Sequence, residues 1–302
     1  EGRADVAYGS YDYTRLRAAV NVPLSETMAV RVSSTYLKHD GFAENITLGQ
    51  ELDDADNFSG RMRILWHPSD QIRLNFTAQY FKQDTNGAAG KGTLDPTIGA
   101  RTMAQDSPSS YEFSSEVYSL IAEWDFESIT VKSLSSYQLD DIVITRDNDK
   151  TDLAVLGPFV LLPSFLDPQD QRQETYTQEL NLVSSEPLFG KIDWIAGFFY
   201  LKNNVEVGVF ERLDFNFDGT FAPVDPADPF GGEGELGFQT RSNPIRKSWS
   251  LYTQSTYHVS DTTRVVGGIR YTDGSVESVV NNFFGVFGSE TLAAASTAVT
   301  GR

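Results

Sequence analysis

The stretch that decides the fold is Gln71–Lys82, QIRLNFTAQYFK. Apolar and polar residues alternate along it, and a period of two is the signature of a β-strand with one apolar face. The apolar side carries Ile72, Leu74, Phe76, Ala78 and Tyr80, and the polar side carries Arg73, Asn75, Thr77 and Gln79.

The same alternation predicts strands along most of the chain, and none of the apolar rows contains Asp, Glu, Lys or Arg. These rows are Leu16, Ala18, Val20 and Val22; Met28, Val30, Val32 and Tyr36; Phe58, Met62, Ile64 and Trp66; Tyr118, Leu120, Ala122 and Trp124; Ile129, Val131 and Tyr137; Ile192, Trp194, Ala196, Phe198 and Tyr200; Trp249, Leu251, Thr253, Ser255 and Tyr257; and Val265, Gly267, Ile269 and Tyr271.

Aromatic rings close these rows at both ends, which favours lipid over a second sheet as their neighbour. The eight-residue step from Trp249 to Tyr257 projects to about 20 Å along a membrane normal, close to the apolar band of an outer-membrane barrel. Lys38 and Lys82 follow Tyr36 and Tyr80 by two residues, where a long side chain can reach the lipid headgroups. A soluble β-rich binding module, with its rows packed against another sheet, stays open as an alternative.

Connection lengths predict an all-β, antiparallel up-and-down transmembrane β-barrel segment, because every strand then crosses and reverses. Short polar links, expected as periplasmic turns, are Asn21–Thr27, His67–Asp70, Asp125–Ser128, Ser184–Lys191 and Val259–Thr262. Long segments, expected as extracellular loops, are His39–Asn57, Asp84–Tyr111, Arg146–Arg172 and Glu211–Arg246. Aromatic girdles are expected beside the turns at Trp66, Trp124, Trp194 and Tyr257, and beside the loops at Tyr36, Tyr80, Tyr137, Tyr200, Trp249 and Tyr271.

We count about eleven strands, including a weak first one near Ala4–Tyr8, whereas single-chain bacterial barrels have an even number. Val276–Arg302 shows no further turn and strand, and no signal peptide precedes Glu1. The chain is therefore expected to be part of a larger barrel.

Composition excludes several classes of function. The formal net charge is −18 and cysteine is absent, which removes disulfides, thiolate metal sites and cysteine nucleophiles. Nucleic acid is not expected as a partner of so acidic a protein. Much of the acid lies in the long segments, as in Glu51, Asp53, Asp54 and Asp56 or Asp147, Asp149 and Asp152, and is expected to be solvated.

Six arginines are expected to point into the lumen from four successive strands. They are Arg15, Arg17, Arg31, Arg61, Arg63 and Arg73. A cluster of like charges repels itself, so either water and ions screen it or an acidic partner fills the space.

One run of the chain reads RQETYTQELNLVS (Arg172–Ser184) and is followed by IDWIAGFFYL (Ile192–Leu201). Shorter motifs accompany it: Asn21–Leu24 with Ala29–Arg31, Asp40–Phe42 with Asn45, Leu65–Pro68 with Leu74, and Val266–Thr272. In these motifs, and in their order and spacing, the chain resembles the TonB-dependent outer-membrane receptors.

The resemblance implies that residues 1–302 are a partial barrel domain of an expected 22 strands, without the plug domain. It implies an active-transport receptor in the outer membrane of a Gram-negative bacterium, importing a ferric siderophore, haem, cobalamin or glycan with energy from the TonB complex. Expected partners are therefore membrane lipid, the TonB complex through the plug region, and the ligand. The arginine cluster would then face the plug. A passive porin without a plug remains the alternative.

No catalytic, cofactor or metal residue is assigned from the sequence, and the ligand-binding residues are not identified. Asp214, Asn216, Asp218, Gly219 and Asp225 resemble the opening of a calcium loop, but flanking helices are missing, so an acidic turn is expected. Hydrolase and phosphate-loop motifs are absent, so we do not expect an enzyme. His39 is expected in an extracellular loop and His67 and His258 at periplasmic turns, too far apart for one site. The loop aromatics Phe210, Phe215, Phe217, Phe221 and Phe230 are expected to pack the longest loop.

Overall fold

The computed structural model describes residues 1–92, 95–148, 150–152, 155–156, 160–161, 164–166, 169–214, 235–286 and 293–301. Side chains are described in the same ranges except 155–166, 210–239 and 283–301. Across these ranges the regular structure is all β, as predicted. None of the described residues forms a helix of the length and hydropathy needed to cross a membrane.

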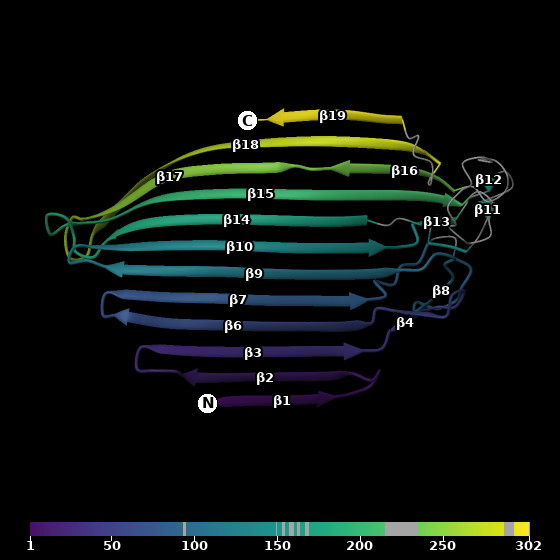
Figure 1. Cartoon of the computed structure of the whole chain (residues 1–302), viewed down its shortest axis with the longest axis horizontal. Helices are drawn as coiled ribbons and strands as arrows, with labels where there is room; N and C mark the ends of the chain where they lie inside the picture. The colour runs from purple at the N-terminus through teal and green to yellow at the C-terminus, as the bar shows by residue number, and fades with distance from the viewer. Residues whose placement is uncertain are drawn as a thin grey trace.

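Long antiparallel strands lie side by side in chain order and form one large sheet (Figure 1). They are β1 (Gly2–Tyr8), β2 (Thr14–Pro23), β3 (Met28–His39), β6 (Ala55–Ser69), β7 (Ile72–Thr85), β9 (Ser110–Asp125), β10 (Ile129–Thr145), β13 (Ser164–Leu166), β14 (Gln169–Ser184), β15 (Ile192–Asp214), β16 (Glu235–Ser242), β17 (Ile245–His258), β18 (Arg264–Val286) and β19 (Ala293–Gly301).

Two positions in the sheet are shared by consecutive strands. β13 and β14 both pair with β15, and β16 and β17 both lie between β15 and β18. Pro244, which has no backbone N–H to donate, stands in the break between β16 and β17. The described sheet therefore has twelve strand positions.

Twelve positions are one more than the sequence analysis counted, and the difference lies at Val276–Arg302. β18 continues to Val286 and β19 pairs with it over nine residues, from Val276↔Gly301 to Phe284↔Ala293. β19 reads AAASTAVTG, and small residues give too weak an alternation to separate a strand from a loop by pattern.

The strand register places the predicted apolar rows on one face of the sheet. Val20 pairs with Val32, Val32 with Met62, and Met62 with Ala78 across four strands. Many of these side chains are exposed, including Leu16, Val32 and Ile269. No second sheet of described residues covers them, so the soluble arrangement, in which the rows pack against another sheet, is not what the structure shows.

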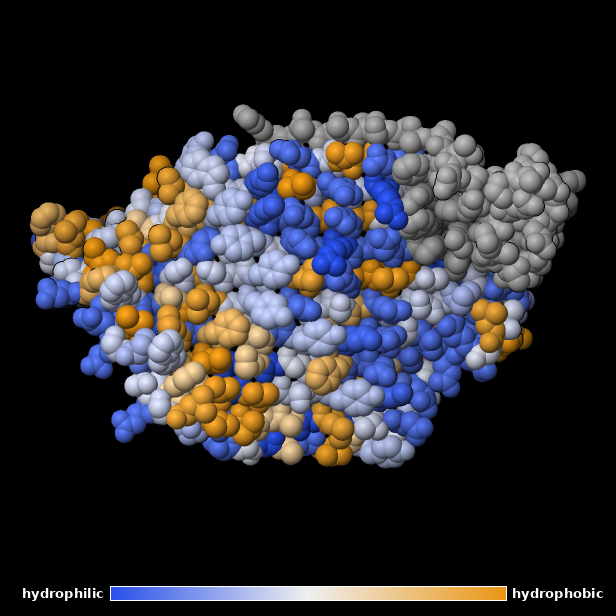
Figure 2. Space-filling model, viewed as in Figure 1, coloured by the Kyte–Doolittle hydropathy of each residue, from blue (hydrophilic) through white to orange (hydrophobic). Residues whose placement is uncertain are grey.

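Residues of the predicted girdle beside the long loops, such as Tyr80, Trp249 and Tyr271, form ring contacts with neighbouring strands. Ring centroids are 6.3 Å apart for Phe58 and Tyr80, and 5.6 Å apart for Trp249 and Tyr271. Figure 2 shows hydrophobic side chains gathered toward the short-turn end over the strands nearest the N-terminus, and hydrophilic ones toward the long-loop end.

The two ends of the sheet differ as the connection lengths predicted. Short turns join β2–β3, β6–β7, β9–β10, β14–β15 and β17–β18 at one end. Long segments leave the other end, where they form small strands of their own (Figure 1). These are β4 (Ala43–Asn45), β5 (Gln50–Leu52), β8 (Thr102–Met103), β11 (Val155–Leu156) and β12 (Val160–Leu161).

Candidate functional site

Two of the long segments, at residues 40–54 and at 86–92 and 95–109, fold together into a compact unit, and residues 146–148 and 150–152 of a third segment attach to it. We call this unit the loop platform. β4 pairs antiparallel with β5 and parallel with β8, which joins segments far apart in the sequence. Ala43, Leu52 and Met103 are buried together, and Ala89 packs against them. Leu52 is fully buried and Met103 is 1% exposed. All the buried apolar side chains among the described residues lie at this end of the sheet.

Side-chain amides of a buried and a partly buried residue connect the first two platform segments. Asn45 donates from Nδ2 to the carbonyl of Gln105 at 3.0 Å and accepts the Gln105 backbone N–H at 3.1 Å. Gln50 makes the same kind of reciprocal pair with Ser109, at 2.7 and 3.1 Å. A side-chain amide that supplies both a donor and an acceptor replaces one step of a backbone ladder, so these pairs fix the register of the segments.

Several platform carboxylates have structural partners, which corrects the expectation that the loop acid is simply solvated. Asp53 and Asp54 accept the backbone N–H groups of Ala89 and Asn86 at 3.0 and 2.9 Å. Asp147 is fully buried and accepts the Ser107 N–H at 3.2 Å, which attaches the third segment. A carboxylate that accepts backbone N–H groups orders a loop that lacks regular structure.

Lys91 is held inside a turn of the platform. Its ammonium donates to Thr97 O and Oγ1 at 2.6 Å and to the carbonyls of Gly99 and Thr102 at 3.1 Å. Asp95, whose side chain is inaccessible to solvent, lies 3.8 Å from the Lys91 Nζ. The cation of Lys91 thus organises oxygen atoms that would otherwise repel one another.

The platform is expected to loosen in acid through Asp95. Burial raises the pKa of Asp95, but hydrogen bonds from Thr97 and Ala104 and the charge of Lys91 lower it more, so the net pKa is below the ordinary value. The stabilisation is therefore present above about pH 4, the pKa of an unfolded aspartate, and is lost as pH falls through the lower folded pKa. Hydrogen exchange of residues 95–104, corrected for intrinsic rates, should show protection falling in that window. Asp95→Asn should remove the pH dependence; an unchanged profile in that variant would contradict the assignment.

A partly exposed aromatic cluster joins the β1–β2 link and the end of β3 to Phe42 of the platform. Tyr11 meets Phe42 edge-on at a centroid distance of 4.9 Å, and His39 stacks on Phe42 at 4.6 Å. The rings of Tyr13 and His39 are nearly parallel with centroids 6.5 Å apart, and Arg101 of the platform donates to the Tyr11 hydroxyl at 3.3 Å. Rings and a guanidinium at the long-loop end of the sheet can hold a planar or anionic ligand group.

The register places all six predicted arginines on the polar face of the sheet. Arg31 is directly opposite Arg63, and Arg61 is opposite Ser33. Their partners differ along the sheet: Arg31 donates to Asn21 at 2.8 Å, Arg61 to Gln79 at 2.6 and 3.0 Å, and Arg63 to Asn75 at 2.8 Å. Amide oxygens satisfy the donors without neutralising the charge.

Carboxylates partner the arginines at the two sides of this group. Arg73 forms ion pairs with Glu123 at 3.0 Å and Asp125 at 2.7 Å. Arg15 lies 3.4 Å from Asp5, and with Arg3 and Arg17 it lines a hollow of about 390 Å³ on the same face. The polar face over β2, β3 and β6 therefore carries positive charge, because the hydrogen-bond partners of Arg31, Arg61 and Arg63 are uncharged amides.

The remaining predicted residues lie apart from the platform or outside the described residues. His258 donates a hydrogen bond from Nε2 to the Asp193 carboxylate at 2.6 Å at the short-turn end, and His67 donates its backbone N–H to the Thr27 carbonyl there. The calcium-like motif at Asp214–Asp225 and the loop aromatics Phe210–Phe230 lie outside the described side chains. Among the described residues, no group of three His, Asp or Glu side chains is placed to hold a metal ion.

A family model supports this architecture. The model described as "TonB dependent receptor-like, beta-barrel" matches residues 64–301. Because it covers more than half of the chain, it favours one class of barrel over the two alternatives that the sequence left open.

Solved structures show the same fold at low sequence identity. The ferric yersiniabactin uptake receptor FyuA from Yersinia pestis matches with a TM-score of 0.70 and 14% identity over 100% of this chain and 43% of its own. The ferric-catecholate import receptor Fiu from Escherichia coli K12, in its closed form, matches with 0.60 and 14% identity over 99% and 47%. The siderophore receptor PiuA from Acinetobacter baumannii matches with 0.57 and 12% identity over 94% and 48%. The chain thus spans less than half the length of each.

Proposed function

This chain belongs to the TonB-dependent receptor family, matching its β-barrel domain, and on that premise we propose that it forms part of the wall and the outer mouth of an import receptor in a Gram-negative outer membrane. TonB-dependent receptors are transporters and not enzymes. The proposal places the apolar face in lipid, the long-loop end outside the cell and the short turns in the periplasm.

One observation carries the proposal: a single sheet exposes an uncharged face bounded by rings while an ordered platform stands at its long-loop end. Exposed apolar rows of this extent are unfavourable in water and favourable in hydrocarbon. Mobile loops would suit a passive pore, whereas a platform with its own core presents fixed groups to a ligand. The aromatic cluster of Tyr11, Tyr13, His39 and Phe42, with Arg101, is the proposed place of first contact.

We propose a ferric siderophore as the imported ligand. The support is that FyuA, Fiu and PiuA, which share the fold, are all named as receptors for such compounds. In this proposal TonB supplies the energy, through a plug domain that is not part of residues 1–302.

Growth tests this function directly. A strain lacking the gene should fail to grow in iron-chelated medium supplied with its cognate compound from a panel of ferric siderophores, and the full-length gene should restore growth. The same gene in a strain without TonB should not. Rescue that does not depend on TonB would instead indicate a passive pore.

We propose that the positive face over β2, β3 and β6 receives the acidic side of the plug. Arg61→Glu with Arg63→Glu in the full-length receptor should then raise hydrogen exchange of the plug by about tenfold or more, because like charges would meet across a poorly hydrated contact. Arg61→Gln with Arg63→Gln should have a smaller effect. Plug protection that is unchanged by charge reversal would refute this contact.

A further inference from the structure

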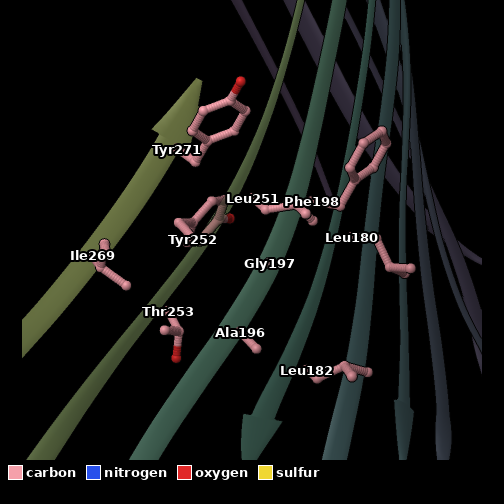
Figure 3. A pocket seen from close by; sticks show the side chains of 10 residues that line it. All are labelled: Leu180, Leu182, Ala196, Gly197, Phe198, Leu251, Tyr252, Thr253, Ile269 and Tyr271. Atoms are coloured by element: carbon pink, nitrogen blue, oxygen red, sulfur yellow. The ribbon is translucent and has the colours of Figure 1, made fainter. Parts of the chain in front are cut away.

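A groove of about 450 Å³ opens on the apolar face across β14, β15, β17 and β18. The groove arises because two small side chains lie between two large ones in a row of four paired residues. Ala196 and Thr253 are the small ones, and Leu182 and Ile269 lie on either side of them. Figure 3 shows Ala196 and Thr253 between the leucines of β14 on one side and Ile269 and Tyr271 on the other. Leu182 and Ile269 are three strand spacings apart, roughly 14 Å.

The groove suits hydrocarbon in its chemistry as well as its shape. The one hydroxyl in its row, on Thr253, donates to the carbonyl of Ile195 at 2.9 Å. A bonded hydroxyl presents no unsatisfied donor to lipid, so the lining is apolar in effect.

Two lysines stand above this groove on its two central strands. Lys202 of β15 is directly opposite Lys247 of β17, on the apolar-face side of both strands. They come two residues beyond Tyr200 and Trp249, which are part of the girdle beside the long loops. Like charges directly opposite each other in a sheet are destabilising unless an anion lies between them.

Carboxylates of this chain do not provide that anion within the described residues. Glu174 lies diagonal to Lys202 in the register, but it pairs with Arg172 at 3.6 Å. Asp273 lies diagonal to Lys247, opposite Trp249, and forms no ion pair within 4.0 Å with either lysine. The other two lysines at this level, Lys38 and Lys82, have partners in Asp56 at 3.7 Å and Asp84 at 3.4 Å.

The distance between the lysine pair and the groove matches the length of one lipid molecule. Six residues separate Lys202 from Ala196, and Lys247 from Thr253, which is roughly 20 Å along a strand and about 15 Å along the normal of a tilted barrel. Half of a bilayer's hydrocarbon core is also about 15 Å. A headgroup at the lysines would therefore place the end of its chain in the groove.

We propose that Lys202, Lys247 and the groove form a binding site for an outer-leaflet lipid whose phosphate headgroup carries a net negative charge. This inference rests on the proposed function, because that function assigns the long-loop end to the outer leaflet. A second copy of the barrel is the poorer occupant, since its convex apolar face cannot enter a concave groove, whereas a flexible chain can.

Native mass spectrometry of the full-length receptor, delipidated in detergent, tests the site. The probe is a dimyristoyl phosphatidic acid, compared with the phosphatidylcholine of the same chains and with inorganic phosphate. We expect tighter retention of phosphatidic acid than of phosphatidylcholine. Lys202→Gln with Lys247→Gln should weaken this retention about thirtyfold, the effect of two charges near a lipid surface. Thr253→Leu, which fills the groove, should also weaken it.

Lys38→Gln with Lys82→Gln is the matched control, since it removes two charges at the same level that already have carboxylate partners. Equal losses in both double variants, a dimer in place of bound lipid, or phosphate binding that Thr253→Leu leaves unchanged would each overturn the site. Heat-modifiable migration on a gel confirms that every variant is folded. Unaltered lipid retention in a receptor that still imports its ligand refutes this inference alone, whereas a receptor absent from the outer membrane refutes the proposed function.

Discussion

Gly197→Ala is expected to destabilise the barrel by about 3 kcal/mol or more, from overpacking and from the loss of hydrogen bonds to a carboxylate. A methyl group on Gly197 would lie 2.5 Å from both Cε2 and Oη of Tyr252 and closer still to Cζ. The Tyr252 ring lies in the space that the missing side chain leaves on the polar face of β15, so the backbone or the ring would have to move.

The ring of Tyr252 matters because it connects strands that do not pair directly. Its hydroxyl reaches across β15 to Glu179 at 2.6 Å and Asn181 at 2.5 Å on β14. Arg270 of β18 lies over the ring at 5.4 Å and donates to Ser250 at 2.9 Å. One displaced ring would therefore loosen four neighbouring strands.

The temperature at which the folded band converts to the unfolded band on a gel measures this effect in the full-length receptor. Gly267→Ala is the matched control, because a methyl group there would meet nothing within 4 Å. Combining Gly197→Ala with Tyr252→Ala should cost less than the sum of the two single changes, since the clash needs both side chains. Additive losses would contradict the packing.

The sheet could be predicted from sequence because its signal is local. Period-two alternation within a dozen residues, as in Gln71–Lys82, gives both the strand and the face that each side chain occupies. β19 was not predicted because Ala, Ser and Thr differ little in polarity and so give a weak alternation. The hydrogen-bond partners of Tyr252 could not be predicted for another reason. They depend on the register across two strand pairs, whereas alternation shows which face a side chain occupies but not its position along the neighbouring strand.

The loop platform could not be predicted because its elements are short and its contacts distant. β4 and β5 have three residues each and β8 has two, below the length at which periodicity is measurable. Its core joins Ala43 and Leu52 to Met103, some fifty residues further along. The acid-rich composition of these segments indicated solvated loops, and it did not show that Asp53 or Asp147 bonds to a neighbouring segment.

Leu52→Asp is expected to abolish the proposed ligand capture, with affinity for the compound that supports growth falling at least about hundredfold. Leu52 is fully buried in a core of very few apolar residues. An unpaired carboxylate there costs several kcal/mol, which exceeds what so small a core can supply. The platform should unfold while the barrel, whose strands pair independently of it, should keep its heat-modifiable migration.

Leu48→Asp separates loss of the platform from added charge, because Leu48 lies in the same loop and is 44% exposed. That variant should bind the ligand within about threefold of the wild type, as surface substitutions cost little. Hydrogen exchange should rise at residues 43–52 and 102–109 in Leu52→Asp and stay unchanged in Leu48→Asp. Capture that survives with those residues unprotected would mean that the lumen, and not the platform, holds the ligand.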